Sequence, residues 1–226
     1  MKILNLLGSI SLLACVATAG TITSVSTRAG LGANDIVQWG TAAQDGVFSV
    51  SPLAVVSAGG VSVSAAVTGG LATYVQNGSG GYIGAFSPGD ILLDSAFNPG
   101  PITIDFGTAV RGVGFNIASL NFGAFTGTLQ LFGAGNTLFG SVSVSGTSSL
   151  ANDGSAPFLG ATSSLRDITR VVISTTGAGS ELTINQMSLL TTNPGSEIPE
   201  PSTITLLSAA MVGGFWMRRG RSKSAR

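Results

Sequence analysis

Apolar residues alternate with small polar residues at a spacing of two over much of the middle of this chain. Residues 61–65 alternate valine or alanine with serine, and residues 102–106 alternate isoleucine or phenylalanine with threonine or aspartate. Successive side chains of a β-strand point to opposite faces, so each run predicts a strand with one buried and one solvated face. Further strands are expected at residues 21–28, 35–39, 71–76, 113–117, 129–131, 141–145, 168–174 and 181–190.

Glycine-rich turn sequences separate these runs. They lie at residues 58–60, 76–81, 98–101, 133–136, 152–154 and 177–179, and no helical period competes with them. About ten short strands spaced in this way predict an all-β fold, an antiparallel β-sandwich that is most simply jelly-roll-like. A β-solenoid is the alternative, but the sequence has no fixed repeat period to support it.

The last of these strands changes phase part-way along its length. Leu182 and Ile184 share one phase of the alternation, and the apolar residues from Met187 onward share the other. One extra residue in a strand shifts every later side chain to the opposite face. We therefore expect a bulge near Asn185 and Gln186.

The complete absence of histidine restricts the chemistry that the chain can perform. Without imidazole there is no Ser-His-Asp or Cys-His machinery, and most zinc, copper and non-haem iron sites are excluded. Carboxylate chemistry, oxygen-ligand metals such as calcium, and binding without chemistry remain. Residues 20–195 contain four basic and eight acidic side chains, a net charge of −4 that gives no electrostatic footprint for nucleic acid.

The N-terminus has the three parts of a secretory signal peptide. Lys2 follows the first methionine, residues 3–16 are mostly apolar, and Ala17 and Ala19 suit the pockets of signal peptidase. We expect export by the Sec machinery and a cut after Ala19. A buried helix is the alternative, but it would need a polar face and caps that are absent. Residues 12–15 also loosely resemble a lipoprotein box, which would lipidate Cys15, although the apolar run continues past it.

The C-terminus carries three features in a fixed order over residues 196–226. First comes the extended sequence Pro199, Glu200 and Pro201, and then the apolar stretch 202–217. About 15 helical residues cover roughly 22 Å, enough for a short single transmembrane helix. The chain ends in five basic residues, Arg218, Arg219, Arg221, Lys223 and Arg226, with no acid among them. Such clusters stay on the cytoplasmic side, which predicts the domain outside and the tail inside.

This tail closely resembles the PEP-CTERM sorting signal of Gram-negative bacteria that make exopolysaccharide. The resemblance rests on Pro199, Glu200 and Pro201, the apolar helix and the arginine-rich end. It implies recognition by an exosortase, an inner-membrane enzyme that removes the tail and passes the domain to the cell surface or matrix. Residues 84–93, 100–106, 111–115 and 156–160 also resemble the exported β-sandwich domains that commonly precede this tail. No catalytic residues are implied by either resemblance.

The alternative for the tail is a C-terminal helix packed on the domain. It leaves unexplained why charge is absent from residues 202–217 and then concentrated in residues 218–226. The expected domain organisation is therefore a signal peptide (1–19), a β-sandwich (20–195) and a sorting tail (196–226).

A glycan-binding surface would be built from aromatic side chains, because sugar rings stack on flat aromatic faces. Trp39, Tyr74 and Tyr82 are the main candidates, followed by Phe86 and Phe125. The two tyrosines flank the glycine-rich loop 77–81, which makes that loop the first choice for a binding surface. Core packing is the alternative for each of the five.

The acidic residues provide weaker hypotheses. Asp90 and Asp94 could hold calcium beside Gly89, with a solvated turn as the alternative. Asp105 is expected to form a surface ion pair with Arg111. A glycoside hydrolase would need two facing carboxylates, and no spacing singles out such a pair. Threonine pairs suited to ice binding are too few to support that function.

These observations together predict an exported, non-enzymatic β-sandwich. It would be anchored briefly in the inner membrane and then released to the cell surface or the exopolysaccharide matrix, where its role is structural or adhesive. A carbohydrate-binding module is the first alternative, and a carboxylate-based glycoside hydrolase is the second.

Overall fold

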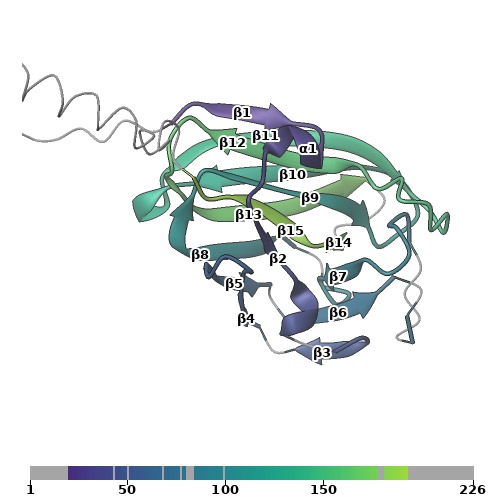
Figure 1. Ribbon diagram of the computed structural model, residues 1–226. Coiled ribbons are helices and arrows are strands. Elements are labelled where there is room, and N and C mark those ends of the chain that lie inside the picture. Colours follow the sequence, from purple (N-terminus) through teal and green to yellow (C-terminus); the bar gives the residue numbers. More distant parts are fainter. Residues whose placement is uncertain are drawn as a thin grey trace, which may run out of the picture. The chain divides into compact units, whose positions relative to one another are not determined.

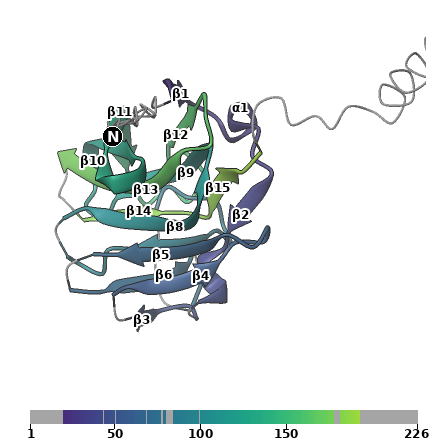
Figure 2. The same ribbon diagram turned by 90° about the vertical axis from the view of Figure 1, so that its left-hand side faces the viewer.

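Fifteen β-strands in the described residues form two antiparallel sheets that pack face to face (Figure 1 and Figure 2). The computed structural model describes residues 20–192 except 43, 50, 68, 77, 80–83, 99 and 178–180, and for residue 75 it describes only the backbone. The strands are β1 (Ile22–Val25), β2 (Asp35–Val37), β3 (Val47–Ser49), β4 (Leu53–Val56), β5 (Ser62–Ala66), β6 (Leu71–Val75), β7 (Ile91–Asp94), β8 (Ile102–Val110), β9 (Gly112–Ser119), β10 (Gly123–Phe132), β11 (Leu138–Ser148), β12 (Phe158–Ser163), β13 (Ile168–Gly177), β14 (Leu182–Ile184) and β15 (Met187–Leu190). One turn of α-helix, α1 (Arg28–Leu31), and two 3-10 turns, Trp39–Thr41 and Ala134–Asn136, connect them.

The chain crosses repeatedly between the two sheets. The six-stranded sheet has the order β11-β10-β13-β8-β5-β4, and the nine-stranded sheet has the order β1-β12-β9-β14-β7-β6-β3, with β15 pairing β9 and β2. From β8 onward, five of the seven connections between successive strands carry the chain to the opposite sheet. The antiparallel β-sandwich predicted from the alternation is confirmed.

The core between the sheets is built by the inward phase of the alternating strands. Ile102 and Ile104 of β8 are fully buried, whereas Thr103 and Asp105 between them are partly exposed. The sheets approach closely at Gly127 of β10, where an added Cβ would lie 3.1 Å from Ile117 Cδ1 of β9. Where the apolar side chains of a strand face a second sheet, they are removed from water. This burial is the main source of the free energy that stabilises a β-sandwich.

The predicted bulge is present between β14 and β15. Both strands pair with the same edge of β9, Ile184 opposite Ile117 and Ser188 opposite Gly114, so the register shifts by one residue across Asn185 and Gln186. The bulge turns Asn185 toward the outer face of the nine-stranded sheet, where its side chain contacts other strands.

Two loops cover part of that outer face. Residues 84–90 and 151–157 are joined by backbone hydrogen bonds, from Asn152 N to Gly84 O (2.9 Å) and from Ala156 N to Ala85 O (2.8 Å). Beneath them lies a second, smaller apolar cluster, separate from the main core and formed by Ala85, Phe86, Leu92, Ala118 and Ala156. These loops bound one side of the site described below.

Some strand predictions need correction. Residues 21–28 form a strand only as far as Val25, because Thr27 caps the helix α1 that begins at Arg28. Trp39 lies in a 3-10 turn after β2. The alternation did not indicate β3, β4, β7 or β12. In β12 the pattern fails because Phe158 and Leu159 are both buried, Phe158 beneath the Arg28 guanidinium and Leu159 in the core.

The expected signal peptide and sorting tail lie outside the described residues. This applies to residues 1–19, to the motif at 199–201, to the apolar stretch 202–217 and to the basic end at 218–226. None of the helices formed by the described residues has the length and hydropathy of a bilayer-crossing segment.

Candidate functional site

A groove lined by polar groups and small apolar residues lies on the outer face of the nine-stranded sheet around Arg28. It consists of two adjoining hollows of about 160 and 910 Å³ that share Arg28 and Gln186. We call it the Arg28 groove. Its polar lining includes Arg28, Asp90, Asn116, Asn185, Gln186 and Ser188, which belong to four separate parts of the chain.

The short helix α1 places Arg28 in this groove. Thr27 Oγ1 accepts a hydrogen bond from Gly30 N (3.0 Å), and Gly32 ends the helix in the left-handed conformation at φ 61°. Leu31 is buried and fixes the helix against the sheet. The side chain that opens the helix then extends over the sheet: Arg28 Nη1 donates to Ser188 Oγ at 2.5 Å.

Arg28 also lies above an aromatic ring. Its guanidinium carbon is 5.9 Å from the centroid of Phe158, at the limit of a cation–π contact. The ring has room because Gly114 and Gly160 lack side chains: a Cβ at either would lie within 2.8 Å of a Phe158 ring carbon. The glycines of two paired strands thus form the seat of the ring.

The bulge residue Asn185 connects the polar groups at the other side of the groove. Its Nδ2 donates to Asp90 Oδ2 (3.1 Å) and Asn116 Oδ1 (3.3 Å), while its Oδ1 accepts from Asn116 N (2.8 Å). Asn116 Nδ2 donates in turn to Ala156 O (2.7 Å). This network holds a carboxylate and two amides in a fixed arrangement beside a cation.

Two opposing effects act on the charge of Arg28. Burial lowers the pKa of Arg28 from its ordinary value, and the negative charge of Asp90 raises it. Because an arginine pKa starts far above neutrality, the guanidinium stays protonated. The groove therefore presents one cation, two carboxylates, Asp90 and the buried Asp35, and several neutral hydrogen-bonding groups.

Comparisons with known proteins do not assign a family. No family model matches the chain, and no curated protein does. Among solved structures, a carbohydrate-binding module of Clostridium stercorarium, CsCBM6-3, determined in complex with cellobiose, is similar over 57% of this chain and 86% of its own. The identity is 16% and the TM-score is 0.31. Because the TM-score is this low, the site is described from this chain's own residues.

Of the aromatic residues expected to bind glycans, Trp39 is not available. It is fully buried, and its Nε1 donates to Asn185 O (2.9 Å), so it supports the bulge from inside. Phe86 and Phe125 are buried as well. Core packing, the alternative for these positions, holds for all three. Tyr74 is half-buried against the outer apolar cluster, and Tyr82 lies outside the described residues.

Asp90 and Asp94, the expected calcium ligands, stand before and at the end of β7 and bond to different groups. Asp94 is buried, and its two oxygens accept from Thr183 Oγ1 and Ala96 N. Burial raises the pKa of Asp94 to about 6, an effect that these hydrogen bonds oppose and the charge of Glu181 increases. Among the described residues no group of three acidic, histidine or cysteine side chains is placed to hold a metal ion. Calcium binding stays a prediction.

The expected ion pair between Asp105 and Arg111 is wrong. Asp105 Oδ1 instead accepts from Arg170 Nε at 2.5 Å, because the register of β8 and β13 places these two residues opposite each other. Arg111 Nε donates to Ser163 O (3.2 Å).

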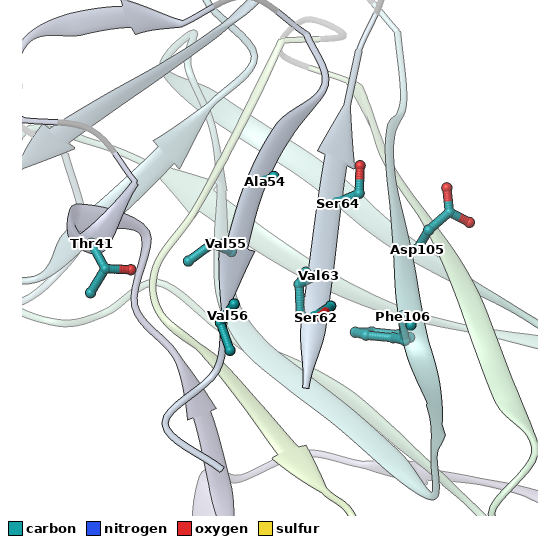
Figure 3. Close-up of a pocket in the computed structure, with 10 residues that line it drawn as sticks. Thr41, Ala54, Val55, Val56, Ser62, Val63, Ser64, Asp105 and Phe106 are labelled. Atoms are coloured by element: carbon teal, nitrogen blue, oxygen red, sulfur yellow. The ribbon is translucent and has the colours of Figure 1, made fainter. Parts of the chain in front are cut away.

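Another hollow, separate from the Arg28 groove and of about 680 Å³, lies at the β4–β5–β8 end of the six-stranded sheet (Figure 3). Ser64 and Asp105 point to one side of the sheet there, and Phe106 points to the other. Its polar groups are hydroxyls and the Asp105 carboxylate, which Arg170 already engages. The hollow lacks the convergent charged and amide side chains of the Arg28 groove.

Sequence reasoning missed the Arg28 groove. Arg28 was assigned to the end of a strand, and its partners lie about 60 to 160 residues away, so no local motif connects them. The sequence contained one indication: only four basic residues occur between residues 20 and 195, so each of them was a candidate for a functional site.

Proposed function

We propose that this protein is exported to the cell surface or the exopolysaccharide matrix and binds carbohydrate there through the Arg28 groove. The observation that carries the proposal is the convergence of Arg28, Asp90, Asn116, Asn185 and Gln186 in one groove. Only 9% of the residues in the chain are charged, so such a convergence is unusual for this sequence.

The groove chemistry suits sugar hydroxyl groups. Each hydroxyl both donates and accepts, and Asp90 offers acceptors, Arg28 offers donors and the amides offer both. A carboxylate or guanidinium held by neighbouring groups can bond two adjacent hydroxyls at once. The larger hollow is lined by small residues, including Ala29, Gly32 and Gly59, which leave space for a flat ring. Because Phe86 and Phe158 are buried beneath the groove, hydrogen bonds rather than stacking would dominate recognition.

The export part of the proposal rests on the two ends of the sequence. Residues 1–19 would direct Sec-dependent export, and the tail 196–226 would anchor the protein in the inner membrane until an exosortase removes it. A β-sandwich released in this way could act as a structural or adhesive component by binding the polysaccharide that surrounds the cell.

Glycan binding is tested with the fragment 20–192, which contains every strand of the described residues. The fragment is applied to an array of neutral and acidic oligosaccharides, and the best ligand is then titrated by calorimetry. Arg28→Ala should reduce affinity at least about tenfold, because a hydrogen bond to a charged group contributes roughly 1.5–3 kcal/mol. Arg166→Ala is the matched control, since Arg166 is exposed and its Nε bonds the backbone oxygen of Ala109.

Other outcomes would favour the remaining functions. Absence of saturable binding to every oligosaccharide would indicate a purely structural matrix protein. Release of reducing ends from a bound glycan would indicate a hydrolase, which needs two facing carboxylates. Among the described residues, the acids that line the Arg28 groove are Asp90 and Asp35. Both oxygens of Asp35 already accept hydrogen bonds, from Ser57 Oγ and Gly59 N among others. We therefore propose binding without catalysis.

Export and sorting are tested on the protein recovered from the cell exterior. Intact-mass measurement should find neither the residues before Gly20 nor the basic end 218–226. A surface form that retains the complete tail would contradict processing by an exosortase, and a form that retains residues 1–19 would contradict the signal peptide.

A further inference from the structure

The first described residue is held by a carboxylate far away in the sequence. Gly20 N donates to Asp167 Oδ2 at 2.7 Å, across a separation of 147 residues. Asp167 lies in the loop between β12 and β13, and this loop also binds the next residue: Thr21 N donates to Ser164 Oγ (2.9 Å) and Ser164 N donates to Thr21 O (2.9 Å). The start of the domain is therefore docked against this loop.

The carboxylate of Asp167 has unused bonding capacity. Its second oxygen, Oδ1, is buried and accepts no hydrogen bond from any residue that the structure describes. A buried carboxylate oxygen without a donor is unfavourable, and most such atoms in proteins have a partner. Arg166 precedes Asp167, and Arg111 lies opposite Ser163 at the start of the same loop, but their Nε atoms donate to the backbone oxygens of Ala109 and Ser163. Neither forms an ion pair with Asp167.

Gly20 is also fitted closely into this position. It is buried, and a Cβ at residue 20 would lie 2.0 Å from Ser163 Oγ and 3.0 Å from the backbone nitrogen of Leu165. Any larger residue at position 20 would have to displace the Ser163 hydroxyl and press on the backbone of the loop.

Gly20 is the residue that the expected cut after Ala19 would make the new N-terminus. Signal peptidase adds water across the Ala19–Gly20 peptide bond, leaving a carboxylate on Ala19 and an amine on Gly20, which takes up a proton near neutral pH. An amide nitrogen with one N–H then becomes an ammonium group with three.

We propose that removal of the signal peptide creates an ion pair between the Gly20 ammonium and Asp167, and that this ion pair fastens β1 to the sandwich only in the mature protein. The ammonium can bond Oδ2 and also supply the donor that Oδ1 lacks. The carboxylate of Asp167 is already a charged acceptor, and a charged donor adds a direct attraction between opposite charges to the hydrogen bond. The mature domain is therefore more stable than any form that keeps residues before Gly20. The inference uses the cut site of the proposed function, but not its glycan binding.

A chemical probe can test the ion pair directly, because the fragment 20–192 contains no lysine and its only amine is the N-terminal one. The fragment is released from a fusion partner by a protease that leaves Gly20 first, and a second fragment starts at Ala19. Both are treated with an amine-reactive ester at pH 7.5. The amine of the Gly20 fragment should react at least about tenfold more slowly, because pairing with Asp167 keeps it protonated and partly enclosed.

Stability is measured on the same two fragments with and without Asp167→Asn. The substitution should lower Tm by about 3 °C or more in the Gly20 fragment and by clearly less in the Ala19 fragment, since only the first has its charge at Asp167. If Asp167→Asn does not fold, the labelling rates of the two unsubstituted fragments decide the question.

Equal labelling rates in the two fragments would overturn the ion pair. An equal effect of Asp167→Asn in both fragments would also overturn it, because the carboxylate would then act only on the neutral amide. Neither measurement depends on how cells process the protein. A natural N-terminus other than Gly20 would contradict the cut site of the proposed function and leave the fragment result intact.

Discussion

Asn185 provides the side-chain acceptor that the backbone of Asn116 uses at the bulge of the nine-stranded sheet. Asn185 Oδ1 accepts from Asn116 N (2.8 Å), while Asn185 N donates to Asn116 O (3.1 Å). The side chain of Asn185 thus supplies the hydrogen-bond acceptor that the bulge removes from the backbone pairing of the sheet. Asn185 also lines the Arg28 groove. The bulge is therefore part of the proposed site as well as part of the fold.

Replacing Asn185 by alanine should destabilise the domain. Asn116 N–H would lose its acceptor in a partly buried position, which costs about 1–3 kcal/mol. Chemical unfolding in urea measures this difference. Gln186→Ala is the control: Gln186 sits in the same bulge, but its side chain is half-exposed, so a change below about 0.5 kcal/mol is expected. Equal losses for the two variants would mean that the bulge tolerates an empty acceptor position.

The contribution of Asp94 to stability should depend on pH with an unusual sign. Its pKa is raised to about 6 in the folded domain, mainly by burial, against an ordinary value of 3.8. The folded state therefore binds the proton more tightly than the unfolded state. This stabilisation is complete below about pH 4 and is lost as the pH rises through about 6, by about 3 kcal/mol in total.

Asp94→Asn should remove this dependence. Tm is measured for the wild-type domain and for Asp94→Asn from pH 4 to pH 7.5. The Tm of the wild type minus that of the variant should decrease as the pH rises. Asp153→Asn is the control of opposite sign, because hydrogen bonds from Ser155 lower the pKa of the exposed Asp153. A difference curve for Asp94 that is flat with pH would contradict the raised pKa.

The fold was predictable where one face of a strand is buried and the other is solvated. The alternation in residues 102–106 located β8, and the change of phase after Ile184 located the bulge. Strand β12 was missed because both of its faces are covered, Phe158 by the Arg28 side chain and Leu159 by the core. Apolar and polar residues alternate only where one face of a strand is exposed to water, so a strand with both faces buried does not show the pattern.

The groove and the ion pairs depend on which strands are neighbours, and the pattern of a single strand contains no such information. Asp105 was paired with Arg111 because the two are close in sequence. The sheet instead places β13 beside β8 and Arg170 directly opposite Asp105. In the same way, Arg28 meets Ser188 and Asn185 only because β15 and β14 lie side by side with β9 under α1.

The ion pair between Asp105 and Arg170 should contribute little to stability. Both side chains are substantially exposed, at 44% and 33%, so solvent and salt screen their attraction. Asp105→Asn should cost less than about 1 kcal/mol at low salt, and the loss should disappear in about 1 M NaCl. Arg111→Met is the matched control, because Arg111 Nε donates to the neutral backbone oxygen of Ser163 and the effect of the substitution should not change with salt.

Gly114 should be sensitive to the addition of a single methyl group, because its position determines where the Phe158 ring lies. A Cβ at Gly114 would lie 2.4 Å from Phe158 Cζ and 3.2 Å from the Cα of Gly160, so the ring must move or the two strands must separate. Overpacking of this kind costs about 1–3 kcal/mol. Because the ring lies under Arg28, Gly114→Ala should also weaken any glycan binding found for the wild type. Gly140→Ala is the control: its Cβ would lie 3.6 Å from Ile22 Cγ1, an ordinary contact, and should change stability by less than about 0.5 kcal/mol. If both alanine variants unfold at the same urea concentration as the wild type, the ring does not depend on the glycine seat, and the position of Arg28 would need another explanation.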